Sequence, residues 1–387
     1  MNERKYFDYA ATTPLDERVF KAMQPYWTEI FGNPSSVHSF GQQADHALEE
    51  ARRSVARLLN ARPDEIVFTS GGSESDNLAL RGTALARREQ TGANHLLISP
   101  VEHHAVSHTA RQLADQSGFE LEFVPVDEFG RVSARDVAER LRPTTAVVSV
   151  VYANNEIGTI NPIAEIGAVC REMGVPLHTD AVQGAAHLPM DVERDKVDLL
   201  SMGAHKFYGP KGVGVLYIRR GTPVLPVQTG GSQEHNLRAG TQNLPLIAGL
   251  AEAFRIAQEE SEENARKYRP MRDRLIGRVL EEIPDARLTG HAVERLPNHA
   301  SFVFKGVDGN ALLMLLDGKG YACSSGSACR VGNPKPSEIL LATGLSEEWA
   351  LGSLRITLGR DTTPEDVDAL ADDLPDLVAA ARSFSSQ

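Results

Sequence analysis

The stretch that decides the fold is Ser201-Met-Gly-Ala-His-Lys206-Phe-Tyr-Gly-Pro-Lys-Gly-Val-Gly214. An apolar run at 197–200 precedes it, and a second run at 213–218 follows it. Apolar runs separated by a glycine-bounded segment predict a strand, a loop and a second strand. Because isolated lysines are mostly solvated surface residues, only the residues at neighbouring strand ends can make Lys206 a candidate for ligand binding.

The composition indicates a globular enzyme-sized chain. Its 387 residues are 41% hydrophobic and 24% charged, which suits two domains. The formal net charge of −12 argues against a nucleic-acid-binding surface. We expect neither a signal peptide nor a membrane span. The three cysteines, Cys170, Cys323 and Cys329, are too few for a disulfide framework and predict a reducing, cytoplasmic setting.

Strand-like and helix-like segments alternate through the first 255 residues. Apolar runs predict strands at 65–70, 95–99, 119–124, 145–152 and 175–180, and helical spacing predicts helices at 42–59, 102–113, 133–141 and 162–173. This order predicts an α/β fold whose mainly parallel sheet is wrapped by helices.

The remainder of the chain has a different character. The helix-rich stretch 244–283 leads to strand-like segments at 300–304 and 354–358, so we expect a smaller α+β domain. The last helix should start at Pro364 and be kinked or interrupted by Pro375. The predicted boundaries are 15–255 for a large cofactor-binding domain, with 1–14 and 256–387 forming the small domain.

A glycine pair, Gly71-Gly72, joins the first predicted strand to a helix. Ser73, with Asp76 three residues later, predicts an N-cap for that helix. A helix N-terminus presents free N–H groups and a favourable dipole, so this turn is a candidate phosphate cradle. Many strand-to-helix turns are glycine-rich, so the motif alone is weak.

Polar residues follow several of the predicted strands. In parallel α/β sheets, ligands gather beyond the carboxyl ends of the strands. The residues at such ends are Ser73, His103, Asn155, Asp180, Gln183 and Lys206. Taken singly, Asp180 could cap a strand and His103 could simply start a helix, but six polar residues together favour a binding site.

A lysine, a strand-end carboxylate and a phosphate cradle together match the needs of pyridoxal phosphate. The lysine amine forms a Schiff base with the aldehyde. An aspartate keeps the pyridine nitrogen protonated, so that the ring accepts electrons. An imidazole such as His103 can stack on the ring, and a buried Arg355 would suit a substrate carboxylate.

The segment from Tyr321 to Pro334 surrounds Cys323 and Cys329 with small residues. Such a composition predicts a loop with an accessible thiol. With five residues between the two cysteines and no second cysteine pair, we expect no structural metal site. Cys170 falls on the apolar side of its predicted helix and should lie in the core.

Taken together, these residues resemble the cysteine desulfurases of the NifS/IscS type, in the class V aminotransferase group of pyridoxal-phosphate enzymes (fold type I). The resemblance covers nearly the whole chain. Its ordered motifs are Tyr9–Pro14, Gly32–Ser36, Thr69–Gly71, Glu102-His103, Asn154–Gly158, Asp180–Gln183, His205-Lys206, Arg238–Thr241, Ser324–Cys329 and Leu358–Arg360.

The resemblance implies a role for each matching residue. Lys206 would be the Schiff-base lysine and the base, His103 the ring-stacking residue, and Cys329 the nucleophile. The implied cofactor-binding residues are Lys206, Asp180, Gln183, Asn155, Gly72, Ser73, Ser201, His205 and, from the other subunit of a homodimer, Thr241. Asn33 and Arg355 would hold the substrate carboxylate.

The implied reaction converts L-cysteine to L-alanine and leaves the sulfur on Cys329 as a persulfide. The alternatives are a selenocysteine lyase or another class V enzyme, and a sulfur-carrier scaffold with a structural cofactor. The acceptor stays open between iron–sulfur scaffolds, tRNA-thiolation proteins and DNA phosphorothioation proteins. The acidic charge favours a protein acceptor over direct contact with nucleic acid, and Cys323 is a bystander or a relay.

Overall fold

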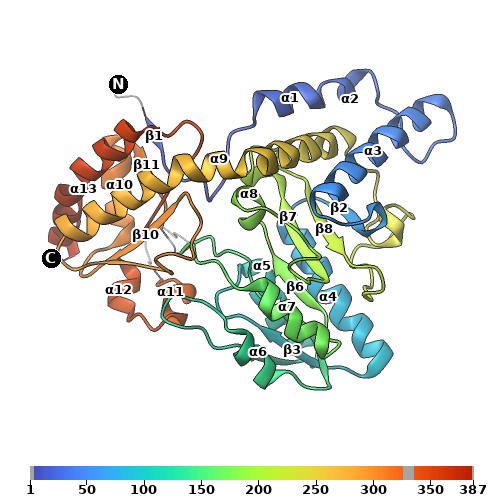
Figure 1. Ribbon diagram of the computed structural model, residues 1–387, viewed down its shortest axis with the longest axis horizontal. Helices are drawn as coiled ribbons and strands as arrows, with labels where there is room; N and C mark the ends of the chain where they lie inside the picture. The colour runs from blue at the N-terminus through green and yellow to red at the C-terminus, as the bar shows by residue number, and fades with distance from the viewer. Residues whose placement is uncertain (1–3, 326–334, 386–387) are drawn as a thin grey trace.

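The computed structural model describes residues 4–325 and 335–385. Figure 1 shows a sheet wrapped by helices on one side of the molecule and a smaller helix-and-sheet unit on the other, where both termini lie. Among the described residues, no helix is both long enough and apolar enough to cross a membrane.

The described residues contain a large, mainly parallel sheet, as predicted. Its neighbouring strands are parallel except where β8 pairs with β2 and β7. In spatial order, its seven strands are β2 (Ile66–Thr69), β8 (Gly214–Ile218), β7 (Leu199–Gly203), β6 (Leu177–Asp180), β5 (Thr145–Ser149), β3 (His95–Ile98) and β4 (Glu120–Phe123).

Most strands of this sheet are fully buried, because helices cover both of its faces. The wrapping helices and nearby short turns are α1 (Glu17–Met23), α2 (Pro25–Thr28), α3 (Ser39–Leu58), η1 (Pro63–Glu65), α4 (Gly72–Thr91), α5 (His104–Ser117), α6 (Ala134–Arg140), α7 (Ile163–Glu172), α8 (Gly184–His187), η2 (Ala204–Lys206) and η3 (Glu234–Asn236).

The smaller unit is built on an antiparallel sheet in which β10 lies between β12 and β9. A short parallel pair, β1 with β11, brings the N-terminal segment into this unit. Its elements are β1 (Lys5–Tyr6), β9 (Ala286–Leu288), β10 (His299–Phe304), α10 (Gly309–Lys319), β11 (Tyr321–Ala322), α11 (Glu338–Ala342), α12 (Glu347–Leu351), β12 (Ser353–Thr357) and α13 (Pro364–Ser385).

The long helix α9 (Leu244–Glu282) runs across both units (Figure 1). Its first half, as far as Ala257, packs into the apolar core beneath the large sheet. From Tyr268 onward it packs into a separate core that also contains Phe7. The predicted domain boundaries at 14/15 and 255/256 stay a prediction, although the change of core along α9 agrees with them.

One local prediction is wrong. Helix α4 begins at Gly72, and Gly71 is its N-cap, so Ser73 lies in the first turn and does not cap the helix. Gly71 has a φ of 156°, which residues with a side chain rarely adopt, and the first-turn N–H groups that follow it have no partner within the helix. Pro375 lies inside α13 and does not interrupt the helix, and a kink at this residue stays a prediction.

Candidate active site

A cavity of about 250 Å³ lies at the carboxyl ends of the parallel strands. It collects residues from the N-terminal segment, from the loops after β2, β3, β5, β6 and β7, and from β12. The residues that line it are Ala10, Ala11, Gly72, Ser73, Asp76, His103, Val151, Ala153, Asn155, Asp180, Val182, Gln183, His205, Lys206 and Arg355.

Lys206 ends the short turn η2 and points into this cavity. Its Nζ donates hydrogen bonds to the carbonyl oxygens of Ala10 and Ala11, both at 2.7 Å. Desolvation, followed by the nearby positive charge of Arg355, lowers the pKa of Lys206 to about 8, although the charges of Asp180 and Asp8 oppose the shift. A substantial share of Lys206 is therefore neutral in mildly alkaline solution and able to act as a nucleophile or base.

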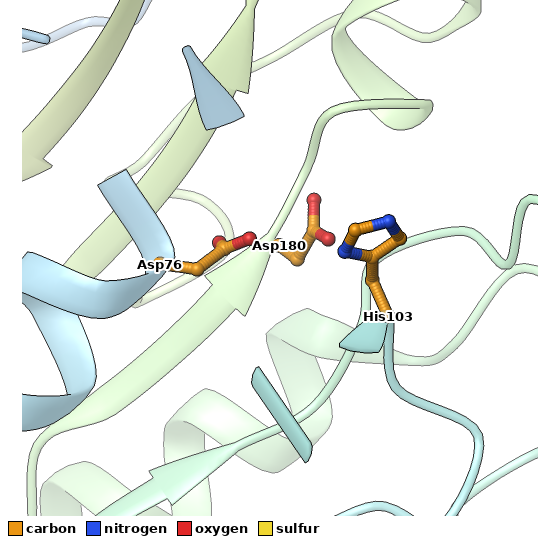
Figure 2. Close-up of side chains that lie close together, drawn as sticks. All are labelled: Asp76, His103 and Asp180. Atoms are coloured by element: carbon orange, nitrogen blue, oxygen red, sulfur yellow. The ribbon is translucent and has the colours of Figure 1, made fainter. Parts of the chain in front are cut away.

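Three acidic or imidazole side chains meet in the lining of the cavity. Figure 2 shows Asp180 between Asp76 and the ring of His103. Ligand atoms of the three residues lie within 4.8 Å of one another. Asp180 ends β6, and its Oδ1 accepts a hydrogen bond from the backbone N–H of Val182 at 2.9 Å. Desolvation lowers the pKa of His103, although the charge of Asp180 opposes this.

The carboxylate and imidazole of this group fit a pyridine ring. Asp180 is only 6% exposed, and burial, followed by the charge of Asp76, raises its pKa to about 6. A buried carboxylate of this kind is stabilised by a cationic partner such as a protonated ring nitrogen. His103 is the N-cap of α5 and accepts from the backbone N–H of Ala105 at 3.1 Å, which orients its ring.

The start of α4 fits a phosphate group. A Cβ on Gly72 would lie 2.6 Å from Cγ2 of Val182, so a larger residue at this position would force Val182 or the backbone to move. A second hollow, of about 410 Å³, shares Gly72, Ser73 and His205 with the main cavity and opens outward past Lys211. First-turn N–H groups, a hydroxyl and a nearby lysine are the donors that a phosphate needs.

Arg355 brings a second positive charge to the cavity. It is 6% exposed and lies on β12. Its Nη2 donates to Oδ1 of Asp8 at 2.7 Å, and its Nη1 donates to the carbonyl oxygen of Asn155 at 3.1 Å. Gln183 is held by a bond from Nε2 to the carbonyl oxygen of Ala10 at 2.8 Å. The predicted residues Asn155, Gln183 and Arg355 therefore share the cavity with Lys206.

Ser201 does not line the cavity. It is fully buried within β7, and its hydroxyl is hydrogen-bonded to Nε2 of His178 at 3.0 Å. The residue lies one strand repeat below the end of β7, so it is too deep to reach the phosphate cradle. Gly203, at the strand end, lies closer, because a Cβ there would be 3.3 Å from the backbone nitrogen of Gly72. The role predicted for Ser201 is therefore corrected.

Two further predicted residues also lie away from the cavity lining. Thr241 is exposed in the loop before α9. Asn33 is exposed too, and its Oδ1 accepts from the backbone N–H of Ser35 at 2.9 Å, which stabilises a turn. Cys329 lies outside the described residues.

The other two cysteines have environments that do not favour a thiolate. Cys170 is fully buried in α7, as predicted, and burial raises its pKa to about 12. Cys323 is partly buried, and burial followed by the charge of Asp8 raises its pKa well above its usual range.

Sequence reasoning missed two residues at the site, Asp8 and Asp76. Asp76 follows Gly72 by four positions on α4, and this spacing places both residues on one helix face. That signal was available from the sequence. Asp8 meets Arg355 across 347 positions of chain, and no local pattern indicates such a contact.

The fold and the cavity define the class of protein. A mainly parallel sheet whose strand ends gather a lysine, a buried aspartate, a stacking histidine and a phosphate cradle is typical of pyridoxal-phosphate enzymes of fold type I. The model of the family "Aminotransferase class-V" matches residues 5–370, and the chain belongs to that pyridoxal-phosphate-dependent family.

Curated relatives narrow the family further. The chain is 46% identical over 384 residues to "Cysteine desulfurase IscS" of Methanosarcina thermophila, covering 99% of this chain and 94% of the relative. It is 45% identical over 385 residues to the protein of the same name from Dictyoglomus turgidum, and the match covers 100% of this chain and 97% of that relative.

Solved structures agree. A "NIFS-LIKE PROTEIN" superposes with a TM-score of 0.89 at 36% identity, covering 97% of this chain and all of that one. DndA from Streptomyces lividans gives a TM-score of 0.77 at 38% identity, covering 91% and 99%. The predicted fold and the predicted resemblance to the NifS/IscS type are confirmed.

Proposed function

We propose that this chain is a cysteine desulfurase that removes sulfur from L-cysteine and passes it through Cys329 to a protein acceptor. The observation that carries the proposal is the cavity in which Lys206, Asp180, His103 and Arg355 converge. Full-length relatives named cysteine desulfurase support the reaction. A scaffold with a structural cofactor would not need a lysine of lowered pKa facing a carboxylate-binding arginine.

Bound pyridoxal phosphate supplies an electron sink for the carbanion that forms at the substrate Cα. In our proposal, Asp180 pairs with the ring nitrogen and His103 stacks on the ring. Gln183, with Asn155, contacts the phenolic oxygen. The first-turn N–H groups of α4, with Ser73 and His205, hold the phosphate. Ser201 has no part in this set, because it is buried below the cavity.

Lys206 bonds the cofactor in the resting enzyme and then moves the Cα proton. Two carbonyl oxygens, those of Ala10 and Ala11, hold its amine at the cavity wall. The lowered pKa of about 8 makes the neutral amine accessible, and only the neutral form accepts a proton.

Arg355 binds the substrate carboxylate through its guanidinium group. In the structure this guanidinium already holds Asp8, so the substrate carboxylate competes with, or joins, that ion pair. Asn33 is proposed as a second carboxylate contact by family resemblance alone, since its side chain is exposed and lies outside the cavity lining.

Cys329 is proposed as the nucleophile from its motif. Described residues on both sides of its segment lie next to the site, which supports this role. Ser324 exchanges two backbone hydrogen bonds with Arg355, at 2.7 and 3.2 Å. On the far side, the hydroxyl of Ser337 donates to Oε2 of Glu156, next to the cavity residue Asn155, at 2.5 Å. The Cys329 thiolate would attack the substrate sulfur, and the bond between that sulfur and the substrate Cβ would break as the S–S bond of the persulfide forms. The electron pair of the broken bond would stay with the carbon fragment, which takes up protons and leaves as L-alanine.

A homodimer would complete the phosphate site. The hollow past Lys211 is open in the single chain, and Thr241 is exposed, which supports the proposal that Thr241 of one subunit reaches the other. Exposed apolar side chains on and between α1, α2 and α3 support a partner surface. They are Phe20, Trp27, Phe31, Val37 and Phe40, and the rings of Phe31 and Phe40 lie 5.6 Å apart.

We propose a protein as the sulfur acceptor, with an iron–sulfur scaffold as the first candidate because the curated relatives carry the name IscS. The net charge of −12 favours a protein acceptor over nucleic acid. Cytoplasmic location stays a prediction from the cysteine content.

The test compares the purified protein with Cys329→Ser, measuring alanine and sulfide from L-cysteine in the presence of a thiol reductant. We expect near-complete loss of both products in the variant, with the yellow cofactor band kept in both proteins. Equal activity in the two proteins would favour a selenocysteine lyase or another class V enzyme. A parent protein without the cofactor band would refute the proposed function itself.

A further inference from the structure

Asp76 is a carboxylate in the cofactor cavity to which none of the roles above applies. It lies on α4, is 1% exposed and lines the cavity. Among the described residues its Oδ1 has no hydrogen-bond partner, and Nε2 of His178 lies 3.5 Å away. A buried carboxylate oxygen without a hydrogen-bond partner is costly, so its place in the cavity lining points to a role for Asp76 in holding the ligand.

The groups that face Asp76 come from three elements packed against α4. Asp180 and His178 belong to β6, and Glu102 and His103 lie just before the first residue of α5. From β7 the hydroxyl of Ser201 hydrogen-bonds to Asp76 and favours its charged form. The set therefore combines three acidic groups with two imidazoles and no permanent positive charge.

Most of these neighbours stay uncharged near neutral pH. Burial lowers the pKa of His178 to about 4 and raises that of Glu102 to about 8. The charge of Asp76 raises the pKa of Asp180. Figure 2 shows the carboxyl group of Asp76 directed toward Asp180, whose own carboxyl group lies next to the ring of His103. Two buried acids this close titrate as a pair.

We propose that Asp76 is a positioning residue for the cofactor nitrogen. It holds a proton beside Asp180, and it sets the pH at which the ring nitrogen of the bound cofactor loses its proton. The inference rests on the proposed pairing of Asp180 with that nitrogen. With Asp76 protonated, Asp180 stays ionised against the ring. As pH rises, Asp76 ionises and adds a second negative charge that strengthens the hold on the cofactor proton.

The pKa shifts of the two carboxyl groups agree with this proposal. Burial raises the pKa of Asp76 to about 7, and burial with the charge of Asp76 raises that of Asp180 to about 6. The pair therefore keeps a proton at a higher pH than free carboxyl groups do. A protonated pyridine nitrogen placed against Asp180 would supply the missing positive charge.

The test is a pH titration of the cofactor absorbance in the holoenzyme and in Asp76→Asn, which keeps the shape and cannot ionise. Removing one charge at this range should lower the midpoint of the cofactor titration by about one pH unit. The matched control is Asp195→Asn. Asp195 is also buried, but it is hydrogen-bonded to Tyr152 and Arg194 and does not line the cavity. The midpoint of the cofactor titration in Asp195→Asn should therefore equal that of the parent.

A second readout does not depend on activity. The folded pKa of Asp76 lies above its unfolded value, so ionisation favours the unfolded state, and the penalty is absent at low pH and complete above about pH 7. The melting temperature of Asp76→Asn should therefore rise relative to the parent between pH 4 and pH 8. If the variant does not fold, Ser201→Ala removes the hydrogen bond that favours ionised Asp76 and should shift the point at which Asp76 ionises to higher pH.

An unmoved cofactor midpoint in Asp76→Asn would overturn the inference, even if the melting temperature changed as expected, because Asp76 would then be an ordinary buried acid. If Ser201→Ala is used instead, a cofactor midpoint equal to that of the parent would also overturn the inference. A parent holoenzyme without a cofactor band would instead refute the proposed function, so the two failures are distinguishable.

Discussion

The buried ion pair between Arg52 and Glu234 should be required for stability, because it fixes a strained loop. Glu234, His235 and Asn236 all have positive φ, at 43°, 58° and 65°. Left-handed backbone costs non-glycine residues about 1–2 kcal/mol each, so the three together cost about 3–6 kcal/mol. The surrounding contacts must offset this cost.

Glu234 provides those contacts. Its carboxylate accepts hydrogen bonds from both terminal nitrogens of Arg52 at 2.9 Å, from the backbone N–H of Phe68 at 2.8 Å and from Nε2 of Gln242 at 3.1 Å. The side chains of Arg52 and Glu234 are only 4% and 1% exposed. Glu234→Gln would leave the buried guanidinium of Arg52 with one anionic partner, the partly exposed Glu49 that accepts from its Nε at 2.9 Å. Breaking a buried ion pair typically costs about 3–5 kcal/mol.

The assay is urea unfolding of the holoenzyme at a fixed excess of pyridoxal phosphate, followed by circular dichroism. Glu234→Gln should unfold at a clearly lower urea concentration than the parent. The matched control is Glu139→Gln, which breaks an exposed pair with Arg135 and should cost under about 1 kcal/mol. Equal unfolding midpoints for the two variants would refute the reasoning.

Two further predictions concern the cavity. Gly72→Ala places a Cβ 2.6 Å from Cγ2 of Val182, so it should weaken the affinity for the cofactor at least about tenfold, as measured by fluorescence titration. The control Gly277→Ala adds its Cβ in open space and should leave the affinity unchanged. If the neutral amine of Lys206 moves the Cα proton, the rate should rise with pH around a midpoint near 8, because desolvation and Arg355 lower the pKa of Lys206. A rate that falls between pH 7 and pH 9 in stopped-flow measurements would contradict that role.

The elements of the fold were largely predictable because the large sheet is buried on both faces. Its strands appear in the sequence as apolar runs, and the polar residues that follow them meet at one sheet edge. This is why Lys206, Asp180 and His103, distant in sequence, lie together as predicted. Helix α9 was indicated as a helix-rich stretch, although its continuity through Pro270 was not.

The remaining site features depend on depth and on long-range contacts, which periodicity does not encode. Ser201 and Gly203 lie on the same face of β7, and only the position of the strand end decides which is near the cradle. Asp76 was interpreted as part of a helix cap, but the cap is Gly71. Asp8 reaches Arg355 only because β1 and β12 belong to the same small unit.

The most direct test of the account is to find where the sulfur goes. The holoenzyme is mixed with L-cysteine without reductant, alkylated, digested and analysed by mass spectrometry. We predict one additional sulfur atom on the peptide that contains Cys329, present also in Cys323→Ser and absent in Lys206→Ala. Alanine formation with the extra sulfur on Cys323, or with neither cysteine modified, would contradict the central claim that Cys329 receives sulfur from the substrate.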